Sequence, residues 1–428
     1  MEQRHASAPA DHHTAESTAE PPEPQGRAAA SPTRRHTARL DGVDLARWIA
    51  IFGMLIVHFW VPFLDPIQPT NLLIEEYAWG RSTILFTFLA GVTLALLTGG
   101  TAPHRGHRAR LSTGRVAVRG GALLVFGLVL SAIVTPTGAG LTVIIAYYGL
   151  YFLLALPFLR LTAGWLAGGA VVAALVGPQL LFVLRRSSET GGAMAEFALN
   201  WNQVDIAQRL ADQGLLELTV FGFYPALSSL AVILAGLAVG RLDLWNPQVR
   251  VTLMLLGGAL AFVSYRISWH AWETYGLAWE LGPQDDLIGP VPTHDARWLW
   301  TSMPHTSTTL EVAGGVGVAL IVVPACLFLA ERFPTALWPF TAAGTMALTI
   351  YSTHALLMAW DETVPDGSGG VADWISGNLA AINVLGAVAF AFAWRRYVGR
   401  GPLEAGISTL STTIVPDPPR RETQTGSE

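Results

Sequence analysis

Long apolar stretches recur along this chain of 428 residues, and they limit its fold more than any other feature. Each stretch is about the length that an α-helix needs to cross a bilayer. Because hydrocarbon offers no water to unpaired backbone groups, such stretches must be helical. The sequence therefore predicts an all-α, polytopic membrane helix bundle of about ten transmembrane helices. The predicted spans are residues 43–63, 80–99, 116–134, 141–159, 163–184, 217–239, 251–268, 311–330, 337–360 and 376–396.

The composition supports a membrane protein and excludes several kinds of chemistry. Charged residues make up 13% of the chain, against about 25% in soluble domains. All basic residues other than histidine are arginine, which excludes a lysine Schiff base and a lysine nucleophile. The single cysteine, Cys326, excludes an intramolecular disulfide and a cysteine-based metal site. We expect membrane lipids around the bundle, and neither a metal nor a nucleic acid bound to it.

Both ends of the chain differ from its apolar centre. Residues 1–38 are polar and rich in proline, alanine and glutamate, without the apolar core of a signal peptide, so they are predicted to form a disordered cytoplasmic tail. Residues 406–428 are predicted to form a second disordered cytoplasmic tail. The transmembrane domain would then cover residues 39–405.

The arginines orient the predicted helices. With ten spans, the arginine-rich loops fall on one side of the membrane and the acidic loops on the other. Arginine-rich loops are as a rule cytoplasmic, so we expect a multi-pass protein of the cell membrane with both termini in the cytoplasm. One loop breaks the pattern, because Arg185 and Arg186 lie beside the fifth span on the outer side.

The first span carries two ionisable residues on one helical stripe, Arg47 and His58, about 16 Å apart at roughly 1.5 Å per residue. Ionisable groups inside a membrane usually face a bundle interior or a wet cavity. His58 is therefore either a structural histidine bonded to a neighbouring helix or a group that takes a proton during catalysis. Arg47, which is spaced to pair with Asp44, either extends to the inner head groups or holds an anionic donor such as a phosphate.

Other polar residues map to the same depth as His58, in the outer half of the predicted bundle. Arginine is unusual on the outer side, so we expect Arg81, which opens the second span, to have a partner. Shared depth makes a single site a hypothesis, although it does not establish that the side chains are neighbours. The residues are Arg81, His305, Glu311, His354 and Asp361. The outer loops beside them are acidic and, in residues 269–310, rich in tryptophan, which favours either a membrane-interface belt or a surface that stacks on sugars.

Several motifs resemble those of a known family. The segment from Arg39 to His58, with Asp44, Arg47 and the Gly53-Met-Leu-Ile-Val-His58 run, is similar to the opening of the bacterial heparan-alpha-glucosaminide N-acetyltransferase catalytic-domain family, within the wider transmembrane acyltransferases. The stretches that fit its later helices are Gly80 to Gly91, Pro304 to Glu311 and Gly344 to Tyr351. The motif Gly401-Pro402-Leu403-Glu404 resembles the end of a related bacterial membrane family of undetermined function.

The resemblance implies an acyltransferase that moves an acyl group, expected to be acetyl, from cytoplasmic acyl-CoA to an acceptor on the far side of the membrane. The acceptor is expected to be the hydroxyl or amine of an extracytoplasmic glycan. In this interpretation His58 is the catalytic base, reached from both faces through a passage lined by the first span. The other assigned catalytic residues are His354 and Asp361. The assigned substrate- and donor-binding residues are Arg47, Asp44, Arg81, His305 and Glu311.

Two other classes of function remain open from the residues alone. A transporter or flippase would use the same intramembrane arginine and histidine as a substrate and proton site. A membrane scaffold would need no buried titratable group. The sequence also leaves open the length of the acyl chain, the oligomeric state, and whether His58 acts as a base or carries the acyl group covalently.

Overall fold

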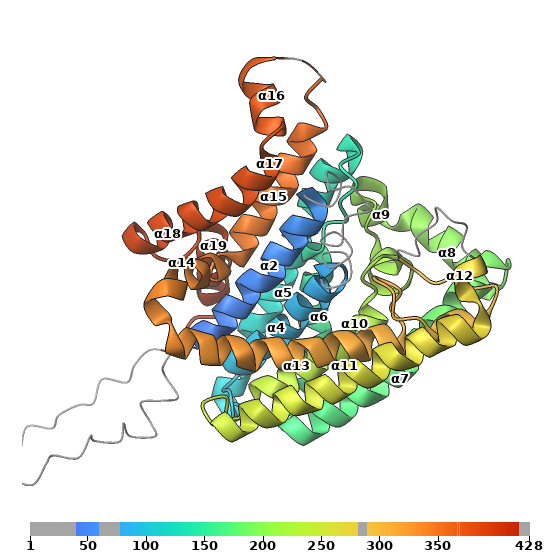
Figure 1. The fold of residues 1–428 in the computed structure, drawn as a ribbon, viewed down its shortest axis with the longest axis horizontal. Coiled ribbons are helices and arrows are strands. Elements are labelled where there is room, and N and C mark those ends of the chain that lie inside the picture. Colours follow the sequence, from blue (N-terminus) through green and yellow to red (C-terminus); the bar gives the residue numbers. More distant parts are fainter. Residues whose placement is uncertain (1–39, 60–77, 281–288, 366, 368, 419–428) are drawn as a thin grey trace, which may run out of the picture. The chain divides into compact units, whose positions relative to one another are not determined.

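The computed structural model describes residues 40–59, 78–280, 289–365, 367 and 369–418. All regular elements in these ranges are helical, so the predicted all-α class is confirmed (Figure 1). Six stretches are long and apolar enough to cross a membrane: α2 (Asp41–Phe59), α5 (Gly106–Val134) with the short turn after it, α7 (Ala163–Glu189), α11 (Pro247–Tyr275), α13 (Thr309–Arg332) and the stretch Leu379–Tyr397, which includes α18 (Ala387–Tyr397). The shorter apolar helices are α4 (Arg81–Leu97), α6 (Ile145–Ala155) and α10 (Ala226–Gly240). Whether the shorter helices cross the membrane stays a prediction.

Helix α2 lies at the centre of the transmembrane bundle (Figure 1). It packs against α4, α13, α14 (Pro334–Gly344) and α15 (Ala347–Asp361). On its far side α4 packs against α10 so closely that a Cβ on Gly91 would lie 2.8 Å from the backbone nitrogen of Leu237. Small residues at such crossings let helix backbones approach within a membrane, where packing rather than water drives association. The contact fixes α4, which carries part of the candidate site.

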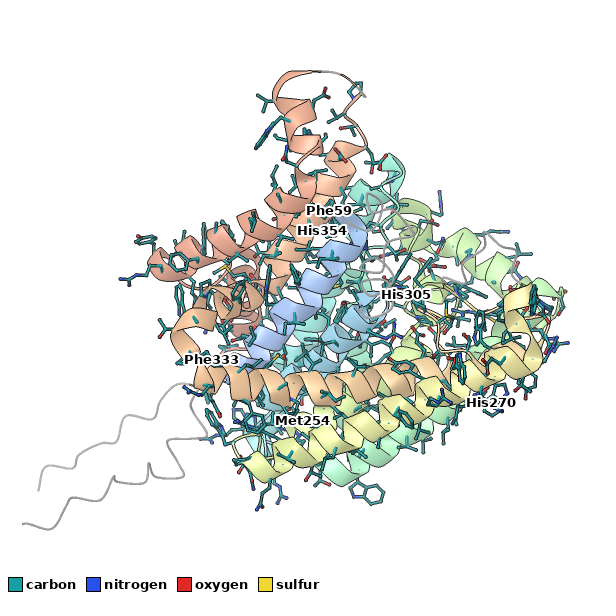
Figure 2. The ribbon with its side chains drawn as sticks, viewed as in Figure 1. Phe59, Met254, His270, His305, Phe333 and His354 are labelled. Carbon is teal, nitrogen blue, oxygen red and sulfur yellow. The ribbon has the colours of Figure 1, made fainter. Side chains whose placement is uncertain are left out.

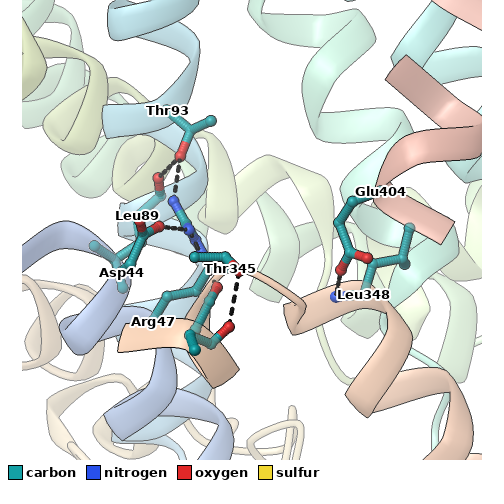
Figure 3. Close-up of polar contacts among 9 residues, drawn as sticks. Asp44, Arg47, Leu89, Thr93, Thr345, Leu348 and Glu404 are labelled. Carbon is teal, nitrogen blue, oxygen red and sulfur yellow. Dashed lines mark hydrogen bonds and ion pairs between the residues drawn. The ribbon is translucent and has the colours of Figure 1, made fainter. Parts of the chain in front are cut away.

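The predicted span over residues 337–360 is wrong as one helix, because it divides into α14 (Pro334–Gly344) and α15 (Ala347–Asp361). Each end at the break is bound by a side chain of opposite charge to the end itself. Arg47 Nη1 donates to the carbonyl oxygen of Gly344 at 3.2 Å, and Glu404 Oε1 accepts from the backbone nitrogen of Leu348 at 2.8 Å (Figure 3). A helix end carries about half a unit charge, positive at the amino end and negative at the carboxyl end. The break is therefore neutralised within the protein.

The carboxyl-terminal helix α19 (Pro402–Ile414) corrects a predicted boundary. Residues 406–414 are helical rather than part of a disordered tail. Helix α19 packs against α5, where Arg115 Nε donates to the carbonyl oxygen of Val415 at 3.0 Å and Arg119 Nε donates to Ser411 Oγ at 3.2 Å. A short polar helix such as α19 is stable only when tertiary contacts support it, so its sequence alone does not predict it.

The connections between the long helices contain short helical segments. The span predicted to begin at residue 217 begins as α10 only at Ala226, after a separate π-helical turn at Glu217–Phe221. The connections after α7 and α11 hold short helices, among them α8 (Ala193–Val204), α9 (Ile206–Ala211) and α12 (Leu277–Glu280). In the tryptophan-rich segment 269–310, Trp298 is buried against Trp272, so that ring is part of the protein core rather than a surface for sugars.

Arg185, which breaks the predicted charge pattern, is a buried structural residue. Its Nε donates to the carbonyl oxygen of Val220 at 2.8 Å, and its Nη2 donates to that of Gly222 at 3.1 Å. Because its donors are satisfied by backbone carbonyls, this arginine gives no information about which side of the membrane its loop occupies.

Arg47 connects three helices, and this contact generates a prediction about stability. Its guanidinium pairs with the buried Asp44 on α2, reaches Gly344 on α14, and donates to Thr93 Oγ1 on α4 at 3.2 Å. Arg47→Met is expected to lower the free energy of unfolding by about 3–5 kcal/mol, because it removes the arginine that pairs with a buried carboxylate. Thermal unfolding in detergent measures this, with Arg110→Met, at an exposed site on α5, as the control.

The double variant Asp44→Asn/Arg47→Met is expected to recover part of that loss, since it removes both charges together. A double variant as unstable as the sum of two single variants would contradict the ion pair as the main contribution of Arg47.

Candidate functional site

Two histidines from different helices form the centre of the candidate site. His58, in the last turn of α2, and His354, in the middle of α15, place Nδ1 of the first 3.0 Å from Nε2 of the second. Their rings are stacked, with centroids 5.0 Å apart and planes inclined by 11°. His354 is only 1% exposed, and the edge of its ring meets Phe59 (Figure 2). The predicted pair of histidines is thus in direct contact.

The hydrogen bond between the rings constrains which nitrogen of His58 can react. Since Nδ1 of His58 is occupied by His354, Nε2 is the nitrogen left for a substrate. For Nε2 to accept a proton, Nδ1 must carry one and donate it to His354 Nε2. His354 would then hold its own proton on Nδ1, which is buried and has no partner among the described residues. In that arrangement the Nε2 of His354 is occupied by His58 and its Nδ1 is buried, so His354 has no ring nitrogen facing the pocket.

A small pocket lies beside the His58 ring. It is enclosed by the end of α2, the start of α4, the connection before α6 and the connection before α13. Its polar lining residues are His58, Trp79, Ser82, Thr83, Thr142, Tyr224, His305 and Tyr351. A second hollow shares Gly80, Thr83, Tyr224 and His305 with the first and adds several hydroxyl groups from α4, α6 and α10. The polar groups thus converge at one end of the bundle.

The third histidine of the pocket stands on a strained connection before α13 (Figure 2). His305 and Ser307 have φ angles of 62° and 58°, a left-handed conformation that costs about 1–3 kcal/mol for a residue with a side chain. Glu311 stabilises it, because its carboxylate accepts from the backbone nitrogens of both residues at 2.5 Å. The ring of His305 meets those of Phe223 and Tyr224 edge to face.

The local sequence explains how Glu311 comes to hold this connection. Thr308 is the N-cap of α13, and its Oγ1 accepts from the Glu311 backbone nitrogen at 3.1 Å. A threonine followed three residues later by glutamate is the capping-box pattern. Here the carboxylate reaches past the cap to His305 and Ser307, so Glu311 positions His305 rather than leaving an open carboxylate for a substrate.

Arg81 has a partner, as expected, and this partner is an aromatic residue, Tyr265. Its Nε donates to Tyr265 Oη at 3.2 Å, and its guanidinium carbon lies 4.9 Å from the centroid of that ring. Glu311 interacts electrostatically with Arg81 at a distance, without forming an ion pair with it.

Not all predicted site residues meet. His58 and His305 line one pocket, and Glu311 lines the adjoining second hollow. His354 contacts His58 but does not line the pocket itself. Asp361 does not line the pocket, since it ends α15 two helical turns beyond His354. Arg47 and Asp44 belong to the helix contact at the break, about three turns of α2 before His58. Nothing in the described structure brings them to the pocket.

The predicted passage to both faces is seen on one side only. Toward the opposite end of α2, the side chains of Ile51, Leu55 and Phe88 are buried and fill the interior among the described helices. In this conformation the pocket reaches His58 from the end where α2 finishes and α4 begins.

Sequence reasoning missed the tyrosines that shape the pocket. Tyr351 Oη accepts from the backbone nitrogen of Ile144 at 3.1 Å and so fixes the connection before α6. Tyr224 lies in the loop before α10, and its backbone oxygen accepts from Tyr151 Oη at 2.5 Å. Aromatic residues are common in apolar spans, and neither tyrosine has a spacing that would have singled it out.

The fold and the site together define a membrane protein with a buried pair of histidines, one of which, His58, lines a polar pocket. The chain belongs to the family described as heparan-alpha-glucosaminide N-acetyltransferase, catalytic, whose profile matches residues 39–265, more than half of its length. A second profile, described as a protein of unknown function (DUF418), matches residues 291–410. No curated protein matches the chain significantly. The resemblance to both families is thus confirmed, and the first family indicates an acetyltransferase.

The buried imidazole of His305 generates a prediction about pH. Burial, and then the neighbouring His58, lowers the pKa of His305 from 6.5 to about 4. The unfolded chain therefore binds this proton more readily than the folded chain does. The contribution of His305 to the free energy of unfolding is therefore complete above about pH 6.5. It decreases as the pH falls toward 4, by up to about 1.4 kcal/mol per pH unit.

The measurement is the unfolding midpoint in detergent between pH 7 and pH 4. The wild-type protein should lose stability more steeply than His305→Gln, which does not titrate. His270→Gln, at an exposed site on α11, should behave as the wild type does. Equal slopes for the wild type and His305→Gln would show that His305 is not held neutral by the fold.

Proposed function

We propose that this protein transfers an acetyl group from cytoplasmic acetyl-CoA to a hydroxyl or amine of an extracytoplasmic glycan. The observation that carries the proposal is the contact of His58 Nδ1 with His354 Nε2, which leaves Nε2 of His58 for chemistry beside a polar pocket. The family match to an acetyltransferase catalytic domain supports the reaction class. The donor and the sidedness follow from the resemblance and the arginine distribution.

In the proposed reaction, the acceptor oxygen or nitrogen attacks the thioester carbonyl while His58 Nε2 takes the acceptor proton. The new C–O or C–N bond forms, the C–S bond breaks, and the proton passes from His58 to the departing thiolate. His354 accepts the Nδ1 hydrogen bond and stabilises the imidazolium that forms transiently. A general base of this kind typically contributes about 10²–10⁴-fold to the rate. A covalent acyl-histidine would use the same lone pair, and both routes share the residues described.

The pocket lining suits an acceptor that carries several hydroxyl groups. Side-chain hydroxyls from α4, α6 and α10 surround the second hollow, and His305 connects it to His58. Hydroxyls both donate and accept, so they match a sugar better than they match an apolar substrate. The donor arm would have to enter from the side that Ile51, Leu55 and Phe88 now fill, which requires these side chains to move.

The break between α14 and α15 weighs against the transporter alternative. In transporters, the ends of broken helices bind the substrate and the coupling ions. Here Arg47 and Glu404 already occupy the two ends. The break is thus part of the scaffold that holds His354 and leaves no helix end open for cargo.

A vesicle assay tests the proposed function. Purified protein is reconstituted with labelled acetyl-CoA on the side of the arginine-rich loops and an amino sugar on the other side. We expect label on the sugar, and a loss of about 10²–10⁴-fold in kcat for His58→Ala. Movement of unlabelled sugar would indicate transport, and neither label nor movement with any glycan acceptor would contradict the enzyme.

His354 has its own expected outcome in the same assay. His354→Gln keeps an oxygen that can accept from His58 Nδ1, so it should retain more activity than His354→Ala. Steady-state kcat values of the two variants, at equal folded fraction, measure the difference. Equal losses would indicate that the hydrogen bond to His58 does not contribute to the reaction.

A further inference from the structure

The motif Gly401-Pro402-Leu403-Glu404 has a direct structural role at the amino end of α15. Glu404 Oε1 accepts from the backbone nitrogen of Leu348 at 2.8 Å (Figure 3). The same oxygen accepts from the backbone nitrogen of Thr349 at 3.1 Å, and Oε2 accepts from Thr349 Oγ1 at 2.6 Å. The N-cap residue of α15, Met346, has no side-chain bond of its own to this turn. The first-turn donors of α15 are therefore satisfied by a residue more than fifty positions later in the chain.

Each residue of the motif contributes to this contact. Pro402 begins α19 at a position where its missing N–H is not needed. The backbone nitrogen of Leu403 donates to Thr349 Oγ1 at 3.3 Å. A Cβ on Gly401 would collide with the Glu404 carboxylate and lie 3.0 Å from Met346 Cγ. Only glycine at position 401 leaves the carboxylate room to reach α15.

The helix capped in this way is the one that carries His354. From Thr349 to His354 is five residues, or about 7.5 Å along α15. Helix α15 starts at a break, so no preceding turn of α14 continues its hydrogen-bond ladder and holds it in place. Its rotation and its first turn depend on what holds its amino end, and the described contact there is Glu404.

We propose that Glu404 is a positioning residue for the acetyl transfer proposed above, acting through α15 to hold His354 against Nδ1 of His58. Glu404 touches no substrate. Its carboxylate fixes the first turn of α15, the turn fixes the ring of His354, and that ring orients the base. The Gly-Pro-Leu-Glu motif is, in this interpretation, part of the catalytic machinery although it lies outside the pocket.

The expected effect is a loss in kcat with little change in KM. A shift of about 1 Å in a catalytic group can cost on the order of 10²-fold in rate. Glu404→Ala should therefore lower kcat by roughly this factor while acceptor binding is retained. Glu404→Gln keeps an oxygen for the two backbone nitrogens and should recover most of the rate, since an amide caps a helix nearly as well as a carboxylate does.

Three further variants separate the loss of the contact at α15 from the loss of the negative charge. Gly401→Ala should reproduce Glu404→Ala, because the added methyl group displaces the carboxylate without removing it. Glu362→Gln, at the exposed carboxyl end of the same helix, removes an equal charge and should leave kcat unchanged. Should Glu404→Ala fail to fold, Gly401→Ala and Thr349→Val, which removes the 2.6 Å bond, provide the same test.

A double-mutant cycle separates positioning from general stabilisation. If Glu404 acts through His354, Glu404→Ala should cost little further activity in a protein that already carries His354→Ala. Losses that multiply instead would overturn the proposal, because they would show that Glu404 acts independently of His354.

A readout without turnover distinguishes this proposal from the proposed function. In protein labelled with ¹⁵N at histidine, Glu404→Ala should shift the signals assigned to His58 and His354, and Glu362→Gln should not. These shifts in a protein that transfers no acetyl group would retain the positioning role and reject the reaction. Unchanged histidine signals in Glu404→Ala would reject the positioning role, whatever the activity.

Discussion

A polar group placed in a membrane must find its partners inside the protein, and this constraint explains most of the polar contacts in the structure. Arg47 is bound by Asp44, Thr93 and a helix carbonyl, and Arg185 by two backbone oxygens. The two ends of the broken helix are satisfied by an arginine and a glutamate from distant parts of the chain. Against this background, His58 differs in having one ring nitrogen bound by His354 while its ring also lines a polar pocket.

Much of the fold could be predicted because bilayer thickness fixes the length of a helix that crosses it. The apolar stretches located the long helices, and the all-α class followed from them. The break between α14 and α15 could not be predicted in the same way. Residues 337–360 contain no Asp, Glu or Arg and are long enough to cross, whereas the ends at the break are bound by Arg47 and Glu404, which are remote in sequence. Helix α19 was missed for the same reason.

The site was predictable in part because histidine in an apolar span is rare and must have a reason. Equal depth correctly grouped His58, His354 and His305, which the structure brings together. Depth gave no information about lateral position, so Asp361 was grouped with them although it lies outside the pocket. The spacing of Arg47 and His58 on one stripe suggested a shared task, whereas Arg47 holds three helices together. Sequence spacing gives the face of a helix but not the neighbour across it.

The two imidazoles in contact come from different matched regions of the chain, His58 from the first profile and His354 from the second. In the proposed reaction the two matched regions act together, because the second region contributes both the histidine that contacts His58 and the glutamate that caps its helix.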